Sequence, residues 1–226
     1  MIAQRLADVN ARLTAACTAN GRAPAEVHLI AVSKTFPASA IRECYAAGQR
    51  DFGENYAQEL RDKARELADL ADLRWHFIGR LQVNKAKYVA PVAFRTHAVD
   101  AVDQAAALVA RAAGPVDVLL AVNTGREPQK GGALPEHVVA RARELAAVAG
   151  VRFRGLMTLP PYDDDPEVEA PFYALLESLA ADVRAAGLPV DELSMGMSHD
   201  FEVAVRYGRG TTTWVRVGTA IFGERT

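Results

Sequence analysis

The feature that most constrains the fold is a regular alternation of short apolar runs with longer amphipathic segments. Eight runs have the length and the β-branched content of buried strands, and a loop and a segment with helical spacing follow each of them. The predicted strands are residues 27–33, 51–53, 74–78, 94–99, 116–123, 153–157, 193–196 and 213–217. Strands separated by helices pair in parallel through right-handed crossovers. Eight such units predict a closed (β/α)8 TIM barrel.

Both ends of the chain depart from the simple repeat. An extra N-terminal helix is expected because Ile2, Leu6, Val9 and Leu13 recur at helical spacing, and the last helix is expected to be truncated. We expect residues 1–226 to form a single domain. An open doubly wound sheet is the alternative, but no Gly-x-Gly-x-x-Gly follows a strand and no phosphate-binding P-loop pattern occurs.

Composition excludes several classes of function. The net charge of −2 gives no support for nucleic-acid or anionic-membrane partners, so any phosphate binding must come from a local site. Cys17 and Cys44 are far apart, which indicates reduced thiols without a disulfide framework or a zinc site. The N-terminus does not resemble a signal peptide, and no segment approaches the ~18 apolar residues of a membrane span. We expect a cytoplasmic protein without a metal, and interpret Asp163, Asp164 and Asp165 as a solvated loop.

Lys34 ends the first predicted strand. A lysine at the tip of a buried strand is costly because burial disfavours the ammonium form, so its pKa is expected to fall. A free amine in a pocket attacks aldehydes and forms a Schiff base. The alternative is a lysine whose stem packs while its charged head reaches water.

Other unusual residues also follow strand ends, where barrels gather their chemistry. Gly218 and Thr219 open the last helix, where a close backbone approach, a hydroxyl group and free N–H groups favour phosphate. Ser198 has a similar position, with a helix N-cap as its alternative role. Arg216 shares a strand face with Gly218, and a buried arginine needs an acceptor such as a carboxylate or an unprotonated pyridine nitrogen. Together with Lys34, these residues describe a pyridoxal phosphate (PLP) site.

Several motifs in one order make the chain resemble the pyridoxal phosphate homeostasis proteins, whose barrel is related to the N-terminal domain of alanine racemase. These motifs span nearly the whole chain and are residues 31–35, 52–55, 75–79, 81–85, 155–157, 193–198 with Asp200, and 215–219 with 222–223. The family departs from this sequence at Ala57, Arg80 and Ala98, which have no assigned role in the site.

The resemblance implies a fold-type III PLP-binding barrel in which Lys34 carries the cofactor as an internal aldimine. It implies that Ser198, Gly218 and Thr219 hold the phosphate and that Arg216 faces the pyridine nitrogen. It further implies that three residues line the pocket, although each has a plainer structural role available: Asn55 as an N-cap, His76 as a hydrogen-bonded core histidine and Met197 as core packing.

We expect a non-catalytic carrier that keeps free PLP low and delivers it to apo-enzymes through transient contacts. An arginine opposite the pyridine nitrogen disfavours its protonation and weakens the cofactor as an electron sink. Alanine racemase draws its second base, a tyrosine, from an additional domain of the partner subunit, and none of Tyr56, Tyr162 or Tyr207 can be assigned that role from sequence. A fold-type III enzyme such as an amino-acid racemase is the alternative.

Two further possibilities stay open at the level of sequence. An aldolase-type barrel would use the same lysine and phosphate loop without a cofactor. Lys130, in the glycine-flanked loop after the fifth strand, is a candidate for cofactor transfer, with a solvated loop charge as the plainer interpretation. The surface pattern gives no strong signal for a dimer, and we expect a monomer.

Overall fold

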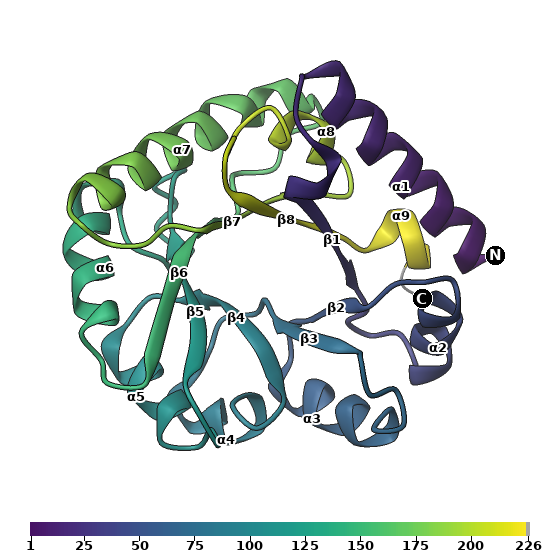
Figure 1. The fold of residues 1–226 in the computed structure, drawn as a ribbon, viewed down its shortest axis with the longest axis horizontal. Coiled ribbons are helices and arrows are strands. Elements are labelled where there is room, and N and C mark those ends of the chain that lie inside the picture. Colours follow the sequence, from purple (N-terminus) through teal and green to yellow (C-terminus); the bar gives the residue numbers. More distant parts are fainter. Residues whose placement is uncertain (225–226) are drawn as a thin grey trace.

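The computed structural model describes residues 1–224 and contains all eight predicted strands, which pair in parallel and close into a barrel in chain order (Figure 1). The strands are β1 (Val27–Val32), β2 (Asp51–Glu54), β3 (Arg74–Phe77), β4 (Ala93–Val99), β5 (Val116–Val122), β6 (Val151–Thr158), β7 (Glu192–Met197) and β8 (Thr212–Val217). The predicted fold class is therefore confirmed.

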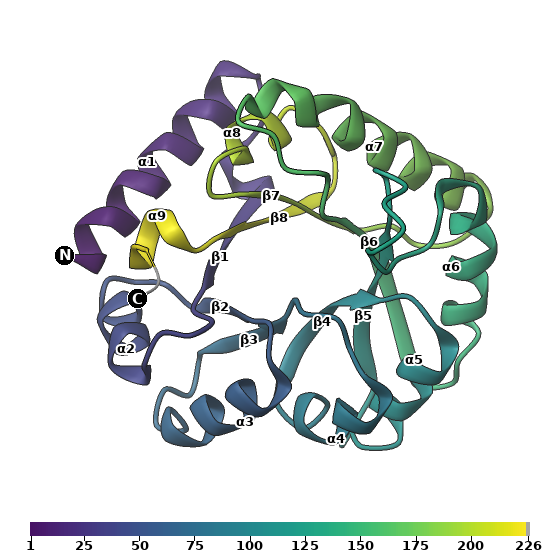
Figure 2. The same cartoon turned by 180° about the vertical axis from the view of Figure 1, so that it is seen from behind.

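Helices surround the barrel and cover its outer face (Figures 1 and 2). The α-helices are α1 (Ile2–Ala19), α2 (Ala38–Ala46), α3 (Ala57–Glu66), α4 (Ala86–Val89), α5 (Val102–Val109), α6 (Val138–Ala146), α7 (Ala170–Ala185), α8 (Phe201–Ala204) and α9 (Thr219–Phe222). Short 3₁₀ turns occur at η1 (Pro24–Glu26), η2 (Val83–Lys85), η3 (Pro135–His137) and η4 (Pro166–Glu169). None of the helices in residues 1–224 is both long and apolar enough to cross a membrane.

The extra N-terminal helix compensates for the short helix at the other end of the chain. α9 has four residues, and α1 lies beside it and also packs against α2 and α8 (Figure 2). Leu6, Val9, Leu13 and Cys17 form the buried stripe of α1, at the helical spacing seen in the sequence. α1 therefore covers a part of the barrel that a longer eighth helix would otherwise protect.

Pairing between the first and last strands brings the two ends of the site together. Ala31 of β1 lies opposite Val217 of β8 in a parallel register. Because both strands run in the same direction, Lys34 after β1 and Gly218 after β8 reach the same rim of the barrel.

The opposite end of the barrel is filled by a layer of charged side chains. Arg95 contacts Asp117 at 2.9 Å and Glu192 at 2.5 Å, and all three side chains are at most 9% exposed. Glu192 also accepts a hydrogen bond of 2.8 Å from Trp214 Nε1. Buried charges require such pairing, and the layer gives the barrel a closed polar base.

The two cysteines, Cys17 and Cys44, are free and buried. Burial raises the pKa of the Cys44 thiol to about 12, so the thiol stays protonated and unreactive. Both cysteines are part of the hydrophobic core.

Gly155 in β6 provides a test of the close contact between β6 and β7. Its φ is +153°, and a Cβ would lie 1.8 Å from the Glu192 carbonyl oxygen. Gly155→Ala should lower the free energy of unfolding by about 3 kcal/mol, because strain and steric overlap add. Gly187→Ala is the matched control, since Gly187 has φ +83° but no neighbour within 4 Å of a Cβ; it should cost about 1 kcal/mol. Equal losses in urea titrations of the two variants would contradict this interpretation.

Candidate functional site

A cavity of about 170 Å³ lies at the carboxyl ends of the strands. Its walls come from the ends of β1, β2, β7 and β8 and the segments that follow β3 and β6. The lining residues are Val32, Lys34, Asn55, Ile78, Leu159, Met197, Ser198, Arg216, Gly218 and Thr219. Seven of the eight site residues predicted from the sequence are in this set, and His76 is the exception.

The backbone on both sides of Lys34 is held by a buried polar network. The Ser33 carbonyl oxygen accepts a hydrogen bond of 2.7 Å from Lys63 Nζ, and the Ser33 hydroxyl donates to Glu54 Oε1 at 2.7 Å. On the other side, the Thr35 N–H donates to Glu59 Oε1 at 2.6 Å. Thr35 has φ +70°, which is strained for a β-branched residue. The network fixes the direction in which half-buried Lys34 leaves β1.

Glu54 and Lys63 form the centre of this network. Lys63 Nζ lies 2.7 Å from Glu54 Oε1 and 2.7 Å from Glu59 Oε1. Glu54 is fully buried, and burial raises the pKa of its carboxyl group to about 7 against the opposing effect of Lys63. Its second oxygen, Oε2, has no hydrogen-bond partner within residues 1–224. The pair is therefore sensitive to removal of either partner.

The predicted phosphate residues meet across two loops. The Gly218 N–H donates a hydrogen bond of 3.0 Å to Ser198 Oγ. A Cβ on residue 218 would lie 3.2 Å from the Val32 carbonyl oxygen, so glycine keeps this wall open. Ser198 is not an N-cap, because α8 begins at Phe201. Since α9 spans only four residues, its dipole is weak, and local N–H and hydroxyl donors remain as the means of holding an anion.

Asn55 is also not an N-cap, because Tyr56 occupies that position before α3. The backbone of Asn55 instead packs closely on the loop after β3, where a Cβ on Gly79 would lie 2.0 Å from the Asn55 carbonyl oxygen. This contact fixes the β2 end of the cavity and leaves the half-buried Asn55 in its wall.

Arg216 is 4% exposed and points its guanidinium between two neutral acceptors. Nη1 donates to Ser194 Oγ at 2.6 Å, and Nη2 donates to the Thr158 carbonyl oxygen at 2.9 Å. Burial lowers the pKa of this guanidinium, while Tyr173 and Asp200 oppose that effect. No carboxylate in residues 1–224 forms an ion pair with it, which leaves the site with a buried cation facing the cavity.

His76 lies deeper in the barrel than expected. Its Nε2 is 2.9 Å from Asp51 Oδ1, and its Nδ1 is 2.9 Å from His97 Nε2. Its ring centroid lies 4.8 Å from that of Trp214. Residues two apart on a strand face the same side and are about 6–7 Å apart along it. His76 is therefore one layer below Ile78, which lines the cavity, and it matches the hydrogen-bonded core histidine considered as its alternative.

A second cavity of about 150 Å³ adjoins the first through the shared residues Ile78 and Leu159. Lys130 lines it and donates hydrogen bonds to the carbonyl oxygens of Leu159, at 3.3 Å, and Pro160, at 3.0 Å. Lys130 also pairs with Glu127. It is thus fixed beside the loop after β6 and is only partly solvated, which differs from a simple solvated loop charge.

Sequence patterns do not reveal the residues behind the side of the cavity formed by Ser198 and Gly218. Asp200 was part of a family motif without a role of its own, yet its Oδ1 accepts the Met197 N–H. Its Oδ2 accepts the hydroxyl of Tyr173 in α7. Glu169, in η4, is fully buried beside this pair. Their contacts join residues far apart in the chain, so no local pattern reveals them.

Comparisons with known proteins show the family of this chain. The family model for the N-terminal domain of alanine racemase matches residues 12–226. A pyridoxal phosphate homeostasis protein from Pseudomonas aeruginosa is 46% identical over 227 residues, covering 99% of this chain and 96% of that protein. The protein of the same name from Aquifex aeolicus is 42% identical, covering 98% of this chain and 97% of that protein. This chain belongs to the pyridoxal phosphate homeostasis protein family.

A solved member of the family has the same barrel. PipY from Synechococcus elongatus, in a structure with PLP bound, superposes with a TM-score of 0.82 at 38% identity, covering 99% of this chain and 100% of that one. Its structure without PLP gives a TM-score of 0.83 at 39% identity, with the same coverage. The predicted family is therefore confirmed over nearly the full length.

The network beside Lys34 can be tested through Lys63. Lys63→Met should lower the free energy of unfolding by about 3–5 kcal/mol at pH 8, because it leaves the Glu54 carboxylate buried without its cation. The loss should shrink below pH 7, where Glu54 becomes neutral. Urea titrations at several pH values measure both effects. Lys87→Met, at an exposed position, should change stability by less than about 0.5 kcal/mol. A pH-independent loss for Lys63→Met would contradict the role of Glu54.

Proposed function

We propose that this chain binds PLP in the 170 Å³ cavity and takes part in PLP homeostasis. The observation that carries the proposal is the convergence of an amine, an anion site and a buried guanidinium in one cavity. In this proposal Lys34 Nζ reacts with the cofactor aldehyde, and Arg216 faces the ring nitrogen. Ser198, Gly218 and Thr219 hold the phosphate, while Asn55 and Met197 form the adjoining walls.

The residues present fit such a cofactor. Gly218 leaves space for an anion beside the Ser198 hydroxyl, and Arg216 is held by neutral acceptors, so its charge is available to a ring nitrogen. When bound, PLP would supply an aldehyde group, and Lys34 would hold it through its amine. The structure of PipY with PLP bound supports PLP as the ligand.

We propose His76 as a support for the floor of the site. The Trp214 ring packs against that of His76 at a tilt and, with Ile78, belongs to the apolar group under the cavity. Burial lowers the pKa of His76, so the ring stays neutral and adds no charge below Arg216.

We further propose that the protein stores and delivers PLP without turnover, as a cytoplasmic monomer that meets apo-enzymes transiently. Two features support this. Arg216 disfavours protonation of the ring nitrogen and so weakens the cofactor as an electron sink. In addition, the residues that line the cavity include no tyrosine from residues 1–224 that could serve as a second base. The names of the relatives from Pseudomonas aeruginosa and Aquifex aeolicus support the role in homeostasis.

The lysine anchor can be tested by colour. Wild-type protein mixed with PLP should gain a visible absorbance band that Lys34→Ala lacks, because the Schiff base extends the conjugation of the ring. Borohydride should fix the cofactor on Lys34, as shown by peptide mass mapping. Lys130→Ala, which alters the lysine of the adjoining cavity, is the control and should keep the band. A protein that stays colourless with PLP would instead favour the aldolase-type alternative.

Turnover and delivery form a second test. Loaded protein should restore activity to a PLP-dependent apo-enzyme in stoichiometric amounts, whereas alanine enantiomers incubated with it should stay unchanged. The measurements are recovered apo-enzyme activity and chiral chromatography of the amino acid. Racemisation that disappears in Lys34→Ala would support the racemase alternative and overturn the proposal of a carrier without turnover.

A further inference from the structure

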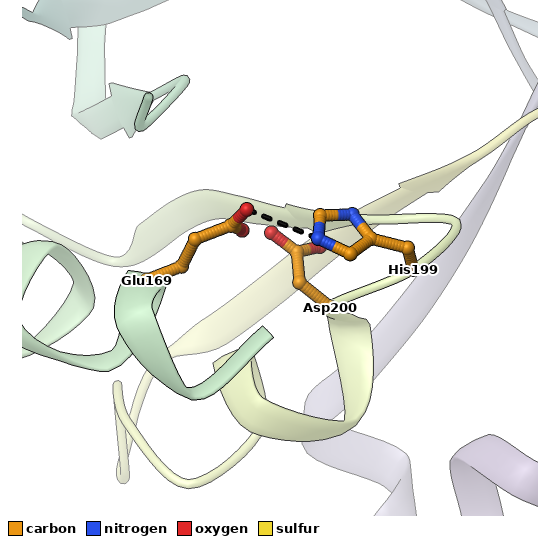
Figure 3. A group of neighbouring side chains, drawn as sticks. All are labelled: Glu169, His199 and Asp200. Carbon is orange, nitrogen blue, oxygen red and sulfur yellow. Dashed lines mark ion pairs between the residues drawn. The ribbon is translucent and has the colours of Figure 1, made fainter. Parts of the chain in front are cut away.

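A buried cluster of titratable side chains lies directly behind the phosphate side of the cavity. One imidazole nitrogen of His199 and one carboxyl oxygen each of Glu169 and Asp200 lie within 4.8 Å of one another. Figure 3 shows the three side chains converging from η4 and from the start of α8. Glu169 and Asp200 are fully buried, whereas the His199 side chain is 26% exposed. The cluster therefore connects the interior of the protein with solvent.

Asp200 links this cluster to the cavity. One carboxylate oxygen accepts the N–H of Met197, and the other accepts the Tyr173 hydroxyl. Met197 and the next residue, Ser198, both line the cavity, and Ser198 Oγ in turn accepts the Gly218 N–H. The position of the Asp200 carboxylate thus determines where the loop of residues 197–200 lies relative to Gly218.

Glu169 is the second carboxyl group of the cluster. The carboxyl groups of Glu169 and Asp200 have oxygen atoms within 4.8 Å of each other, so a proton carried by Glu169 can be shared with the Asp200 carboxylate. Burial and the neighbouring Asp200 carboxylate raise the pKa of Glu169 to about 8. For Asp200, the effect of burial is outweighed by hydrogen bonds from Glu169, Tyr173 and the Met197 N–H, so its pKa is lowered. The pair holds one proton at neutral pH.

Every element packed against Glu169 contributes a polar or charged group. His199 Nε2 lies 3.1 Å from Glu169 Oε1 and 3.0 Å from the Asp163 carbonyl oxygen. The Asp163 N–H donates to Glu169 Oε1 at 3.4 Å, and the Tyr173 hydroxyl lies 3.4 Å from Oε2. Further out, the Tyr162 ring packs against His199 at a tilt, and its hydroxyl donates to Asp164. The charge of Arg216, on β8, interacts with Asp200 and Tyr173. None of these groups in residues 1–224 is a permanent cation in contact with Glu169.

We propose that Glu169 is a positioning residue whose single proton keeps Asp200, and through it the loop of residues 197–200, in the geometry that binds a phosphate ester. The proposal rests on the proposed function and adds a regulation to the same site. When the proton is lost, two buried carboxylates face each other, and their repulsion displaces Asp200 from the Met197 N–H. Retention of the cofactor therefore weakens as the pH rises.

The same coupling works in the other direction. A phosphate dianion beside Ser198 adds negative charge near the pair and makes loss of the Glu169 proton harder. Because coupling between two sites is reciprocal, PLP binding must take up protons near the pH at which Glu169 titrates. This provides a readout that a purely structural role of Glu169 would not change.

The decisive comparison is between wild type and Glu169→Gln, since glutamine donates the hydrogen bond to Asp200 at every pH. Dissociation constants for PLP are measured by equilibrium dialysis from pH 6.5 to 9.0. The ratio of the wild-type constant to the Glu169→Gln constant should stay level up to pH 7 and rise about tenfold by pH 9. Effects of pH on Lys34 and on PLP itself cancel in this ratio. A ratio that stays level over the whole range overturns the proposal.

Two further variants assign the effect. Glu167→Gln changes an exposed carboxylate of the same 3₁₀ turn, which is paired with Arg206, and should follow wild type. In His199→Gln the dissociation constant for PLP should also rise above pH 7 as it does in wild type. A step that persists in Glu169→Gln and disappears in His199→Gln overturns the assignment to Glu169. Calorimetry in two buffers of different ionisation enthalpy should show proton uptake near pH 8 for wild type and its loss in Glu169→Gln.

Stability of the cofactor-free protein gives an independent measurement. In the folded protein Glu169 holds its proton more tightly than at its usual pKa of 4.5. Its contribution to stability is therefore complete below pH 4.5 and is lost as the pH rises through about 8. The urea midpoint of wild type should fall relative to that of Glu169→Gln between pH 5 and 8 and then level off. Parallel midpoints overturn the proposal. If wild type binds no PLP at any pH while this shift is present, the proposed function fails and the titration of Glu169 stands.

Discussion

Closure of the sheet by pairing of β1 with β8 is the constraint on which the site depends. Lys34 and Gly218 are far apart in the chain, and the register of Ala31 with Val217 brings the segments that carry them to one rim. α1 protects the closed barrel on the outside by packing on α9, α8 and α2. Lys34 and Gly218 are thus brought together by backbone hydrogen bonds, which hold their distance far more firmly than flexible loops would.

The part of the structure that could be predicted from sequence follows from local patterns. Apolar runs of strand length identified all eight strands to within one or two residues at most ends, because burial on both faces leaves a clear composition. Once the barrel was inferred, its geometry gathered the strand-end residues without further information. Lys34, Arg216 and Gly218 were found in this way, since each follows or ends a strand whose direction is fixed by the fold.

The remaining features of the site depend on how deep a side chain lies in the barrel and on contacts between residues that are distant in the chain. His76 lies in β3 and Ile78 directly follows that strand, and only the depth of the cavity floor decides which of them lines the cavity. Ser198 and Asn55 were open to interpretation as N-caps because that assignment depends on where a helix begins, a boundary that sequence defines poorly.

Contacts between distant residues are a second limit. Lys63 pairs with Glu54 of β2 because of how α3 is rotated about its own axis, and no local sequence pattern reveals that rotation. The contact of Glu169 with Asp200 joins two crossover segments and has no sequence pattern at all.

The buried ion pairs of Arg95 with Asp117 and Glu192 close one end of the barrel. A small-molecule ligand cannot pass through a layer of paired, desolvated charges. A ligand of the cavity would therefore enter and leave by the rim that carries Lys34. Under the proposed delivery of PLP, a receiving enzyme would therefore have to approach this same rim. The residues around that rim, rather than the barrel wall, decide how fast such an exchange proceeds.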